Sequence, residues 1–499
     1  MPGPATVSPN LAESDSQAHL VMQAARSVKW AFLYNIVPRL VTPFSTMILA
    51  ALLTPADFGL VAISTFVIAL AQIVVDLGLG KAVIQRETYV NEAASISLWI
   101  SLLVSAGIYL TLWIAAPWIS AAYKNDRVID VIRVAALALP LTALATIPKA
   151  LLLRNMEFRS LFWVNSSFLI LQAVASVVLA VAGTGYWALI WGPLVGMTIS
   201  AGLAWGLAHW RPMIVINWPV LRSMLGFSIW VMVSGFQNWL FLYAGNVIAG
   251  LFLGVRGLGT YSLGFSIAIL IPAFFVASLG DVAYPAFCKL QGCPLEIGHN
   301  LTRLQLMAGA ILFPAALGLS AIAPSAVELL YGQKWQGLGT VIGFLVIMPG
   351  LSYIWLLNEH AYQAIGRPDI WTKLSGFSLL ALVPLLWVAA PYGLLVFTLV
   401  RFGGAWFLPL GNIFFGARSL GIGAKEQFKA FASPLSLSVI MFALVYLLTK
   451  QLNPFEGVSG CIKLLSIVIV GAIVYLLLIW LVNRELCNRL FLSLRRMIS

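Results

Sequence analysis

Charged side chains are scarce in this chain of 499 residues: Asp, Glu, Lys and Arg supply 9% of it, against 61% hydrophobic residues. Soluble domains carry about 25% charged and about 45–50% apolar residues. Because so few charged residues cannot cover a water-facing surface, we expect lipid to be the solvent of this chain. At about 20 residues per crossing, it has room for about 14 transmembrane helices and for no sizeable domain outside the membrane.

Residue patterns for metal, disulfide and nucleotide chemistry are also missing. The four cysteines and the four histidines show no zinc or disulfide spacing. No P-loop sequence is present, so we expect no ATP hydrolysis by this chain. The sequence therefore predicts no metal site and no cofactor.

Hydrophobic runs separated by short polar breaks predict an all-α integral membrane protein. The expected spans are 29–53, 57–78, 94–120, 128–153, 161–183, 186–208, 226–252, 258–283, 300–322, 337–365, 370–390, 393–417, 430–449 and 461–483. Residue pairs at an offset of 200, such as Gly59 with Gly259, indicate two pseudosymmetric six-helix bundles followed by two C-terminal helices. Repeated bundles of this kind are typical of transporters.

These spans divide the chain into six parts. They are a cytoplasmic polar tail at 1–28, a six-helix bundle at 29–208, a cytoplasmic linker at 209–225, a second six-helix bundle at 226–417, two additional helices at 430–483 and a basic cytoplasmic tail at 484–499.

Lys and Arg number 29 and Asp and Glu 17, which gives a net charge of +12. In a membrane protein such an excess sets orientation, because basic loops stay in the cytoplasm. With the N-terminus in the cytoplasm, most basic residues outside the spans fall on the cytoplasmic side, including those of 149–159 and 484–499. We therefore expect a multi-pass protein with both termini cytoplasmic, and no nucleic-acid partner.

Five segments of the chain resemble one known family. They are LLTPADFGLVAISTFVIALAQIVVDLGLGKAVIQRE at 52–87, LLLRNMEFRSL at 151–161, GLGTYSLGFSIAIL at 257–270, AYPAFCKLQ at 283–291 and YQAIGRPDIWTKLS at 362–375. Together they are similar to the polysaccharide transporter family, the Wzx-type oligosaccharide flippases of the MOP superfamily, and especially to members similar to colanic acid exporters.

The resemblance implies two bundles around a V-shaped cavity and export of undecaprenyl-pyrophosphate-linked oligosaccharide repeat units across the bacterial inner membrane by alternating access. For such a transporter we expect contact with membrane lipids, polysaccharide polymerase and glycosyltransferases as partners, and coupling to a proton or sodium gradient or to the membrane potential. Another MOP-type transporter, such as a lipid II flippase or a cation-coupled drug antiporter, is an open alternative. A polyprenyl-dependent membrane glycosyltransferase or polymerase would need a longer first outer loop than 54–57, so we expect no enzyme.

Polar side chains recur at helical spacing on otherwise apolar segments, as a hydrated path for a charged headgroup requires. Any single stripe is better explained by hydroxyls and amides that hold helices together. Six stripes that include two arginines favour a shared cavity. We expect the pyrophosphate and glycan to contact Asn35, Arg39, Thr42, Gln72, Gln172, Asn238, Arg401 and Asn412.

Arg39 and Arg401 fall within expected spans, where an arginine costs about 2.5–3.5 kcal/mol on insertion scales. Because guanidinium forms paired hydrogen bonds to phosphate oxygens, we interpret both as pyrophosphate ligands. The open alternatives are a structural ion pair with Asp76 or Glu359 and, for Arg39, snorkelling to the membrane interface.

Glu359, His360 and Asp76 are the titratable residues that suit coupling to a proton gradient. Each of them also fits a solvated helix end. Pro38 and Pro43 flank Arg39, and a bend there would move the cation, so we expect these prolines to act in gating.

Overall fold

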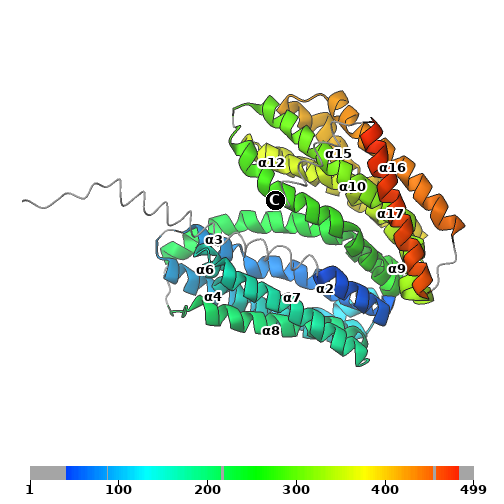
Figure 1. The fold of residues 1–499 in the computed structure, drawn as a ribbon. Helices are drawn as coiled ribbons and strands as arrows, with labels where there is room; N and C mark the ends of the chain where they lie inside the picture. The colour runs from blue at the N-terminus through cyan, green and yellow to red at the C-terminus, as the bar shows by residue number, and fades with distance from the viewer. Residues whose placement is uncertain (1–40, 87, 215–217, 291, 453–456, 483–499) are drawn as a thin grey trace, which may run out of the picture. The chain divides into compact units, whose positions relative to one another are not determined.

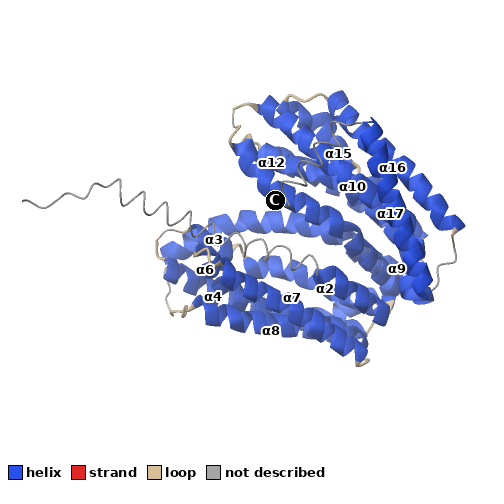
Figure 2. Ribbon diagram, viewed as in Figure 1, coloured by secondary structure: helices blue, strands red, loops and turns tan. Residues whose placement is uncertain are grey.

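The computed structural model describes residues 41–86, 88–214, 218–290, 292–452 and 457–482. Every regular element in this described part is helical (Figure 1, Figure 2). The same part holds 12 helices that are long and apolar enough to cross a membrane. The expected all-α membrane fold is confirmed, and the count of fourteen spans stays a prediction.

The helices are joined by short connections. The first are the short helix Val41–Leu52, α2 (Pro55–Asp76), α3 (Leu79–Gln85), α4 (Val90–Tyr123), α5 (Arg127–Ala135), α6 (Ala138–Arg154), α7 (Phe158–Val181), α8 (Ala188–Ala208) and α9 (Trp218–Cys288). They are followed by α10 (Pro294–Tyr331), α11 (Leu338–Ser352), α12 (Leu357–Ala364), α13 (Pro368–Ala389), α14 (Leu394–Gly404), α15 (Phe407–Gly411), the π-helical turn η5 (Asn412–Gly416), α16 (Ala424–Gln451) and α17 (Gly457–Val482).

Two expected connections are shorter than the sequence predicts. In place of loops at 209–225 and 284–299, α9 begins at Trp218 and ends at Cys288, and α10 begins at Pro294. The first turns of α10 are built from polar residues such as Glu296 and Asn300, which are exposed. The backbone hydrogen bonds of a helix can continue beyond its apolar segment into water. Hydropathy therefore locates the end of the apolar segment and misses the end of the helix.

Three of the expected spans differ from the observed helices: two of them are merged into one helix, and the third is divided. The spans 226–252 and 258–283 both lie within α9, which changes direction at Gly254, where φ is 68°. Glycine adopts this left-handed conformation without the cost of a Cβ. The single span expected at 393–417 is instead divided into α14, α15 and η5. Pro409 lies within α15 and lacks the amide hydrogen that a continuous helix needs.

The described residues form two compact units. Unit 1 holds the described parts of 1–52 and 64–239, and unit 2 holds 53–63 with the described parts of 240–499. Both α2 and α9 therefore contribute residues to each unit. The division does not test the domain boundaries expected from the sequence, which stay predictions.

Small residues bring helices close together in both units. In unit 1, α7 packs along α8, where a side chain at Gly192 would meet Ser176 and one at Gly196 would meet the carbonyl of Phe168. In unit 2, the repeat-related glycines Gly59 and Gly259 lie at one crossing of α2 and α9. A side chain at either glycine would collide with a backbone carbonyl of the other helix.

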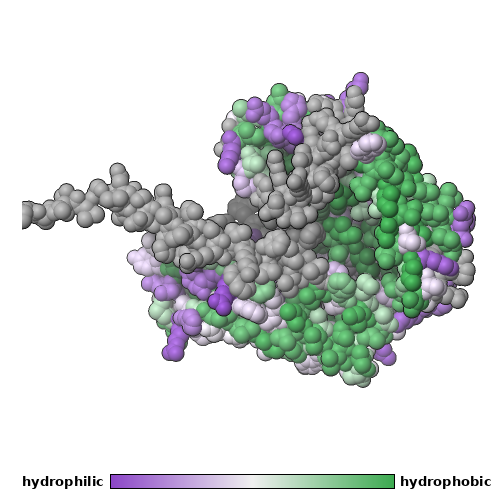
Figure 3. Space-filling model, in the orientation of Figure 1, coloured by the Kyte–Doolittle hydropathy of each residue, from purple (hydrophilic) through white to green (hydrophobic). Residues whose placement is uncertain are grey.

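The helix α10 is central to unit 2, where it packs against α11, α16 and α17 (Figure 1). The outer face of α17 is apolar, and Leu465, Ile469, Leu476 and Leu481 are each half exposed or more. Figure 3 shows hydrophobic side chains along this helix. In lipid, exposed apolar side chains of this kind carry no hydration cost, which agrees with a multi-pass membrane protein.

Candidate functional site

Three of the candidate residues lie outside the described part of the chain, namely Asn35, Pro38 and Arg39. Their expected roles in binding and gating stay predictions. Thr42 and Pro43 lie at the start of the helix Val41–Leu52, where Thr42 is exposed and Pro43 is half-buried. The Thr42 carbonyl accepts a hydrogen bond of 2.8 Å from the hydroxyl of Thr46, so the polar stripe expected here is partly bonded to its own backbone.

The remaining candidates of unit 1 lie on different helices. Gln72 on α2 and Gln172 on α7 are half-buried, and Asn238 on α9 is exposed. No hydrogen bond joins any two of these three side chains among the described residues. Asp76 is the exposed last residue of α2, and its charge interacts with Lys81 of α3. The structure thus places Asp76 beside a basic residue at a helix end.

Arg401 is a buried cation in the last turn of α14, with 3% of its surface exposed. Its Nη2 donates a hydrogen bond of 3.3 Å to the carbonyl of Phe241 on α9. Its guanidinium carbon lies 5.7 Å from the ring centre of Phe241 and 5.4 Å from that of Phe265. The ion pairs among the described residues join Asp369 to Arg367 and Lys373. The alternative ion pair between Arg401 and Glu359 is therefore absent from the described part of the chain.

Asn412 belongs to a chain of hydrogen bonds between α10, α12 and η5. The amide nitrogen of Gln305 donates to Asn358 Oδ1 at 2.6 Å, and Asn358 Nδ2 donates to the Tyr362 hydroxyl at 3.2 Å. That hydroxyl donates to Asn412 Oδ1 at 2.8 Å, and Asn412 Nδ2 donates to the Leu408 carbonyl at 2.9 Å. The exposure of Gln305, Asn358, Tyr362 and Asn412 is 0%. In this conformation the amide of Asn412 cross-links helices.

Glu359 and His360 are adjacent and half-buried on α12. The carboxylate of Glu359 accepts a hydrogen bond of 3.1 Å from Gln363. Beyond the end of α12, the exposed Arg367 donates a hydrogen bond of 2.9 Å to Asp369, and this bond raises the pKa of Arg367. Glu359 and His360 therefore lie near a solvated end of the helix, and their role in coupling stays a prediction.

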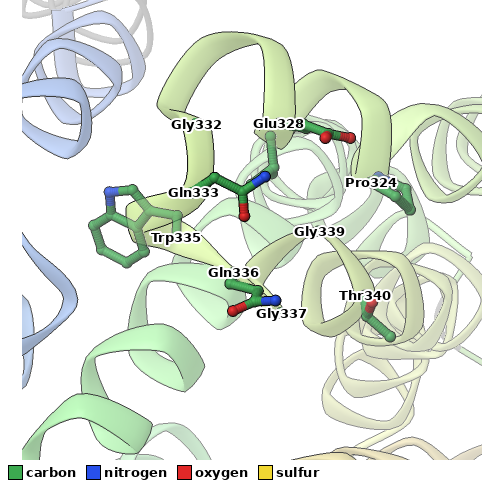
Figure 4. A pocket seen from close by; sticks show the side chains of 10 residues that line it. Pro324, Glu328, Gly332, Gln333, Trp335, Gln336, Gly337, Gly339 and Thr340 are labelled. Carbon is green, nitrogen blue, oxygen red and sulfur yellow. The ribbon is translucent and has the colours of Figure 1, made fainter. Parts of the chain in front are cut away.

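A pocket of about 240 Å³ lies at the turn between α10 and α11 (Figure 4). Gly332 and Gly337 reverse the chain there with φ of 64° and 86°. Gly339 allows α11 to begin directly against Pro324, because a Cβ at Gly339 would lie 2.5 Å from the Pro324 Cα. The indole of Trp335 is 1% exposed and fixes the turn to the rest of unit 2.

Four polar side chains line this pocket, namely Glu328, Gln333, Gln336 and Thr340. All four are exposed, and none makes a side-chain hydrogen bond to another described residue. In Figure 4 the amides of Gln333 and Gln336 extend toward the same space. Amide and hydroxyl donors beside carboxylate and amide acceptors, without a cation among the described lining residues, suit a neutral hydroxyl-rich group.

An apolar groove of about 470 Å³ runs between α10, α16 and α17. Its walls include Gly318 and Gly471 together with Ile311, Ile322, Met441, Val468 and Leu476. The hydroxyl of Tyr475 is turned away into a 2.8 Å hydrogen bond with the Ala310 carbonyl. The groove lies along helices that can span a membrane, and its chemistry suits a hydrocarbon chain.

The sequence analysis missed both the pocket and most of the buried hydrogen-bond chain. Asn358 and Tyr362 are four residues apart and so share a helix face, which is a signal that could have been used. Their connection to Gln305 and Asn412 spans about 50 residues in each direction. Only the packing of α10, α12 and η5 reveals it.

Residues 48–339 match the model of a family described as "Polysaccharide biosynthesis protein". Among curated proteins, the chain is 22% identical to Lipopolysaccharide biosynthesis protein WzxC of Escherichia coli, with 71% of this chain and 73% of that protein covered. It is 22% identical to Teichuronic acid biosynthesis protein TuaB of Bacillus subtilis, with coverage of 82% and 85%. It is 24% identical to Succinoglycan biosynthesis transport protein ExoT of Rhizobium meliloti, with coverage of 61% and 62%.

Two solved structures share the fold. The lipid II flippase MurJ in an inward closed conformation aligns with a TM-score of 0.70 and 14% identity over 93% of this chain and 99% of that one. An inward-facing MATE multidrug transporter of the MOP superfamily aligns with a TM-score of 0.60 and 14% identity over 85% and 100%. At these identities the similarity concerns the fold alone.

Proposed function

The chain belongs to the polysaccharide biosynthesis protein family, and we propose that it moves undecaprenyl-pyrophosphate-linked oligosaccharide repeat units across the bacterial inner membrane. It is a multi-pass membrane protein of a transporter family, and the names of its relatives refer to biosynthesis or transport of lipopolysaccharide, teichuronic acid and succinoglycan. These relatives support an oligosaccharide flippase over an enzyme.

The observation that carries the proposal within the molecule is the pair of chemically opposite sites in unit 2. The groove between α10, α16 and α17 is apolar and lies along membrane-spanning helices. The pocket at the α10–α11 turn is polar and presents unbonded amides and a carboxylate. A lipid-linked sugar needs both, because its tail favours apolar surfaces and each of its hydroxyls needs a hydrogen-bond partner. We propose that the groove receives the polyprenyl tail and that Gln333 and Gln336 contact sugar hydroxyls.

The pyrophosphate of such a substrate requires cations. From the sequence we propose Arg39 as a ligand of the pyrophosphate, and Asn35, Thr42, Gln72, Gln172 and Asn238 as further polar residues of the transport path. For Arg401 the same role requires an opened conformation, because the cavity beside it has a volume of about 10 Å³, close to the space of one water. Alternating access, in which the path opens to one side of the membrane at a time, would supply such a change.

The driving force belongs to the same proposal. A proton or sodium gradient would act through acidic or titratable side chains, and Glu359 and His360 are the adjacent pair in unit 2 that offers them. We further propose cytoplasmic termini, and glycosyltransferases and a polymerase as the enzymes that act before and after transport.

The experiment is a flipping assay with purified protein in liposomes that contain a fluorescent undecaprenyl-pyrophosphate oligosaccharide. We expect the labelled lipid to equilibrate between the two leaflets only when the protein is present. A membrane-impermeant quencher, which reaches the outer leaflet alone, measures the fraction of lipid there. The Arg39→Ala variant should lose most of this activity, and the double variant Gln333→Ala/Gln336→Ala should lower it several-fold. Gln451→Ala, at an exposed glutamine that ends α16, is the matched control.

The same liposomes separate the competing transporters. Lipid II or a cationic drug replaces the oligosaccharide lipid in parallel samples. Equal or faster movement of either one would contradict the proposed substrate, and no movement of any of them would contradict the transport function itself.

A further inference from the structure

The environment of Arg401 is incomplete in one respect. Its Nη2 is bonded to the Phe241 carbonyl, and the guanidinium also interacts with the buried hydroxyl of Tyr261. Its Nη1 is buried and has no acceptor within hydrogen-bond distance among the described residues. Buried guanidinium nitrogens are normally paired, because an unpaired polar group away from water costs about 1–3 kcal/mol and more when it is charged. The neighbouring rings of Phe241 and Phe265 stabilise the cation through their faces and offer Nη1 no acceptor.

A small cavity adjoins this guanidinium. It has a volume of about 10 Å³ and is lined by Arg401 together with Ser352, at the end of α11, and Ser378 of α13. Neither serine hydroxyl makes a hydrogen bond to another described residue. The nearby Ser375 of α13, by contrast, bonds back to the carbonyl of Trp371 at 2.8 Å. The hydroxyls of Ser352 and Ser378 are therefore available as donors.

The charge of the site is positive and uncompensated. The described ion pairs involve Asp369 with Arg367 and Lys373, and no described carboxylate lies within ion-pair distance of Arg401. The other polar group in the cavity wall is the phenol of Tyr353, which interacts electrostatically with Arg401. A water molecule would satisfy Nη1 but leave the charge, whereas an anion answers both needs.

We propose that this cavity binds a small monovalent anion, with chloride as its physiological occupant. Nη1 of Arg401 and the hydroxyls of Ser352 and Ser378 would donate hydrogen bonds to it. The volume excludes a phosphate or a carboxylate-bearing metabolite in this conformation, so the ligand is a single-atom halide. The bound ion would hold α11, α13 and α14 together. The inference does not depend on the transported substrate.

The test is the thermal unfolding midpoint of the purified full-length protein in detergent, at constant sodium concentration, as chloride replaces gluconate. We expect a saturable rise in Tm of about 3 °C with chloride or bromide. Arg401→Gln should abolish the rise, and Ser352→Ala/Ser378→Ala should weaken it. Arg133→Gln is the control and should keep the rise in Tm. Arg133 also lies over an aromatic ring, that of Trp113, and donates a hydrogen bond to the Trp113 carbonyl, but it is only half-buried.

A midpoint that is the same in chloride and gluconate for the wild type, or a rise that persists in Arg401→Gln, would overturn the proposal. If Arg401→Gln does not fold, crystals of the wild type grown in bromide give the decision. An anomalous peak within hydrogen-bond distance of Arg401 Nη1 supports the anion site, and a water without anomalous signal there contradicts it.

Discussion

The two units bury different kinds of polar side chain. In the described part of unit 1, the buried polar residues are all serines, on α2, α4, α7 and α8. In unit 2 they include Gln305, Asn358, Asn412, Gln427 and Arg401. A serine hydroxyl can return to a carbonyl of its own helix, as Ser97 does to Ala93 at 2.6 Å. Ser95 does the same and in addition accepts a hydrogen bond of 3.0 Å from the amide of Met213. Amides reach across to other helices.

This difference indicates two ways of holding membrane helices together. In unit 1, backbones approach closely at small residues such as Gly192 and Gly196, which are four residues apart on α8. Its side-chain hydrogen bonds between helices run to backbone carbonyls, as from Trp205 on α8 to Leu144 on α6 at 3.0 Å. Unit 2 adds a chain of hydrogen bonds from one buried side chain to another, from α10 through α12 to η5. The first arrangement tolerates sliding of helices, whereas the second fixes their register. Substitutions should therefore damage the two units by different mechanisms.

The largest effect is expected at the small-residue contact of unit 1. A Cβ at Gly196 would lie 2.6 Å from the Phe168 carbonyl oxygen of α7, and the longer side chain of Gly196→Leu must force the helices apart. We expect a loss of about 3 kcal/mol in the free energy of unfolding. SDS titration of the purified protein in mixed micelles measures it. Gly202→Leu on the same helix is the control, because no heavy atom lies within 4 Å of its Cβ position. Equal loss in both variants would show that α8 is held in some other way.

A smaller loss is expected when the hydrogen-bond chain of unit 2 is interrupted. Asn358→Leu removes one hydrogen-bond partner from the buried amide of Gln305 and one from the buried hydroxyl of Tyr362, which together cost about 2 kcal/mol. Ser97→Ala in unit 1 should change stability by less than about 0.5 kcal/mol, because it removes only a bond within one helix.

The double variant Gln305→Leu/Asn358→Leu sharpens this prediction. If the two amides stabilise one another, the double variant should be less destabilised than the sum of the single variants, with a coupling of about 1 kcal/mol. Strict additivity would mean that the buried chain does not act as a connected set, and the contrast with unit 1 would fail.

Hydropathy was enough to predict the helical membrane fold, because each crossing of the bilayer requires a long apolar run. It could not place the ends of α9 and α10, where polar residues continue the helix into water. It also could not anticipate the division of 393–417, which depends on Pro409 and the turn η5.

The candidate residues show the same limit more strongly. Periodicity correctly marked Asn412 and Arg401 as unusual polar residues within a span. It could not distinguish a residue that faces a hydrated path from one that bonds to its neighbours, because both satisfy the same spacing. In the structure Asn412 meets Tyr362 and Arg401 meets Phe241. Those partners are 50 and 160 residues away in the sequence, so packing alone identifies them.

The smallest effect is expected at one of the side chains that link helices in unit 1. The indole of Trp239 on α9 donates a hydrogen bond of 2.9 Å to the Phe66 carbonyl on α2, and its ring lies stacked 6.0 Å from that of Phe236. Trp239→Phe keeps an aromatic ring but removes the donor, so we expect a loss of about 1 kcal/mol in SDS titration. Trp191→Phe on α8 is the control, because that indole is 44% exposed and makes no hydrogen bond to a described residue. A loss at Trp239 as large as that of Asn358→Leu would mean that unit 1 also depends on hydrogen bonds between its helices, and the distinction between the units would then be one of residue type only.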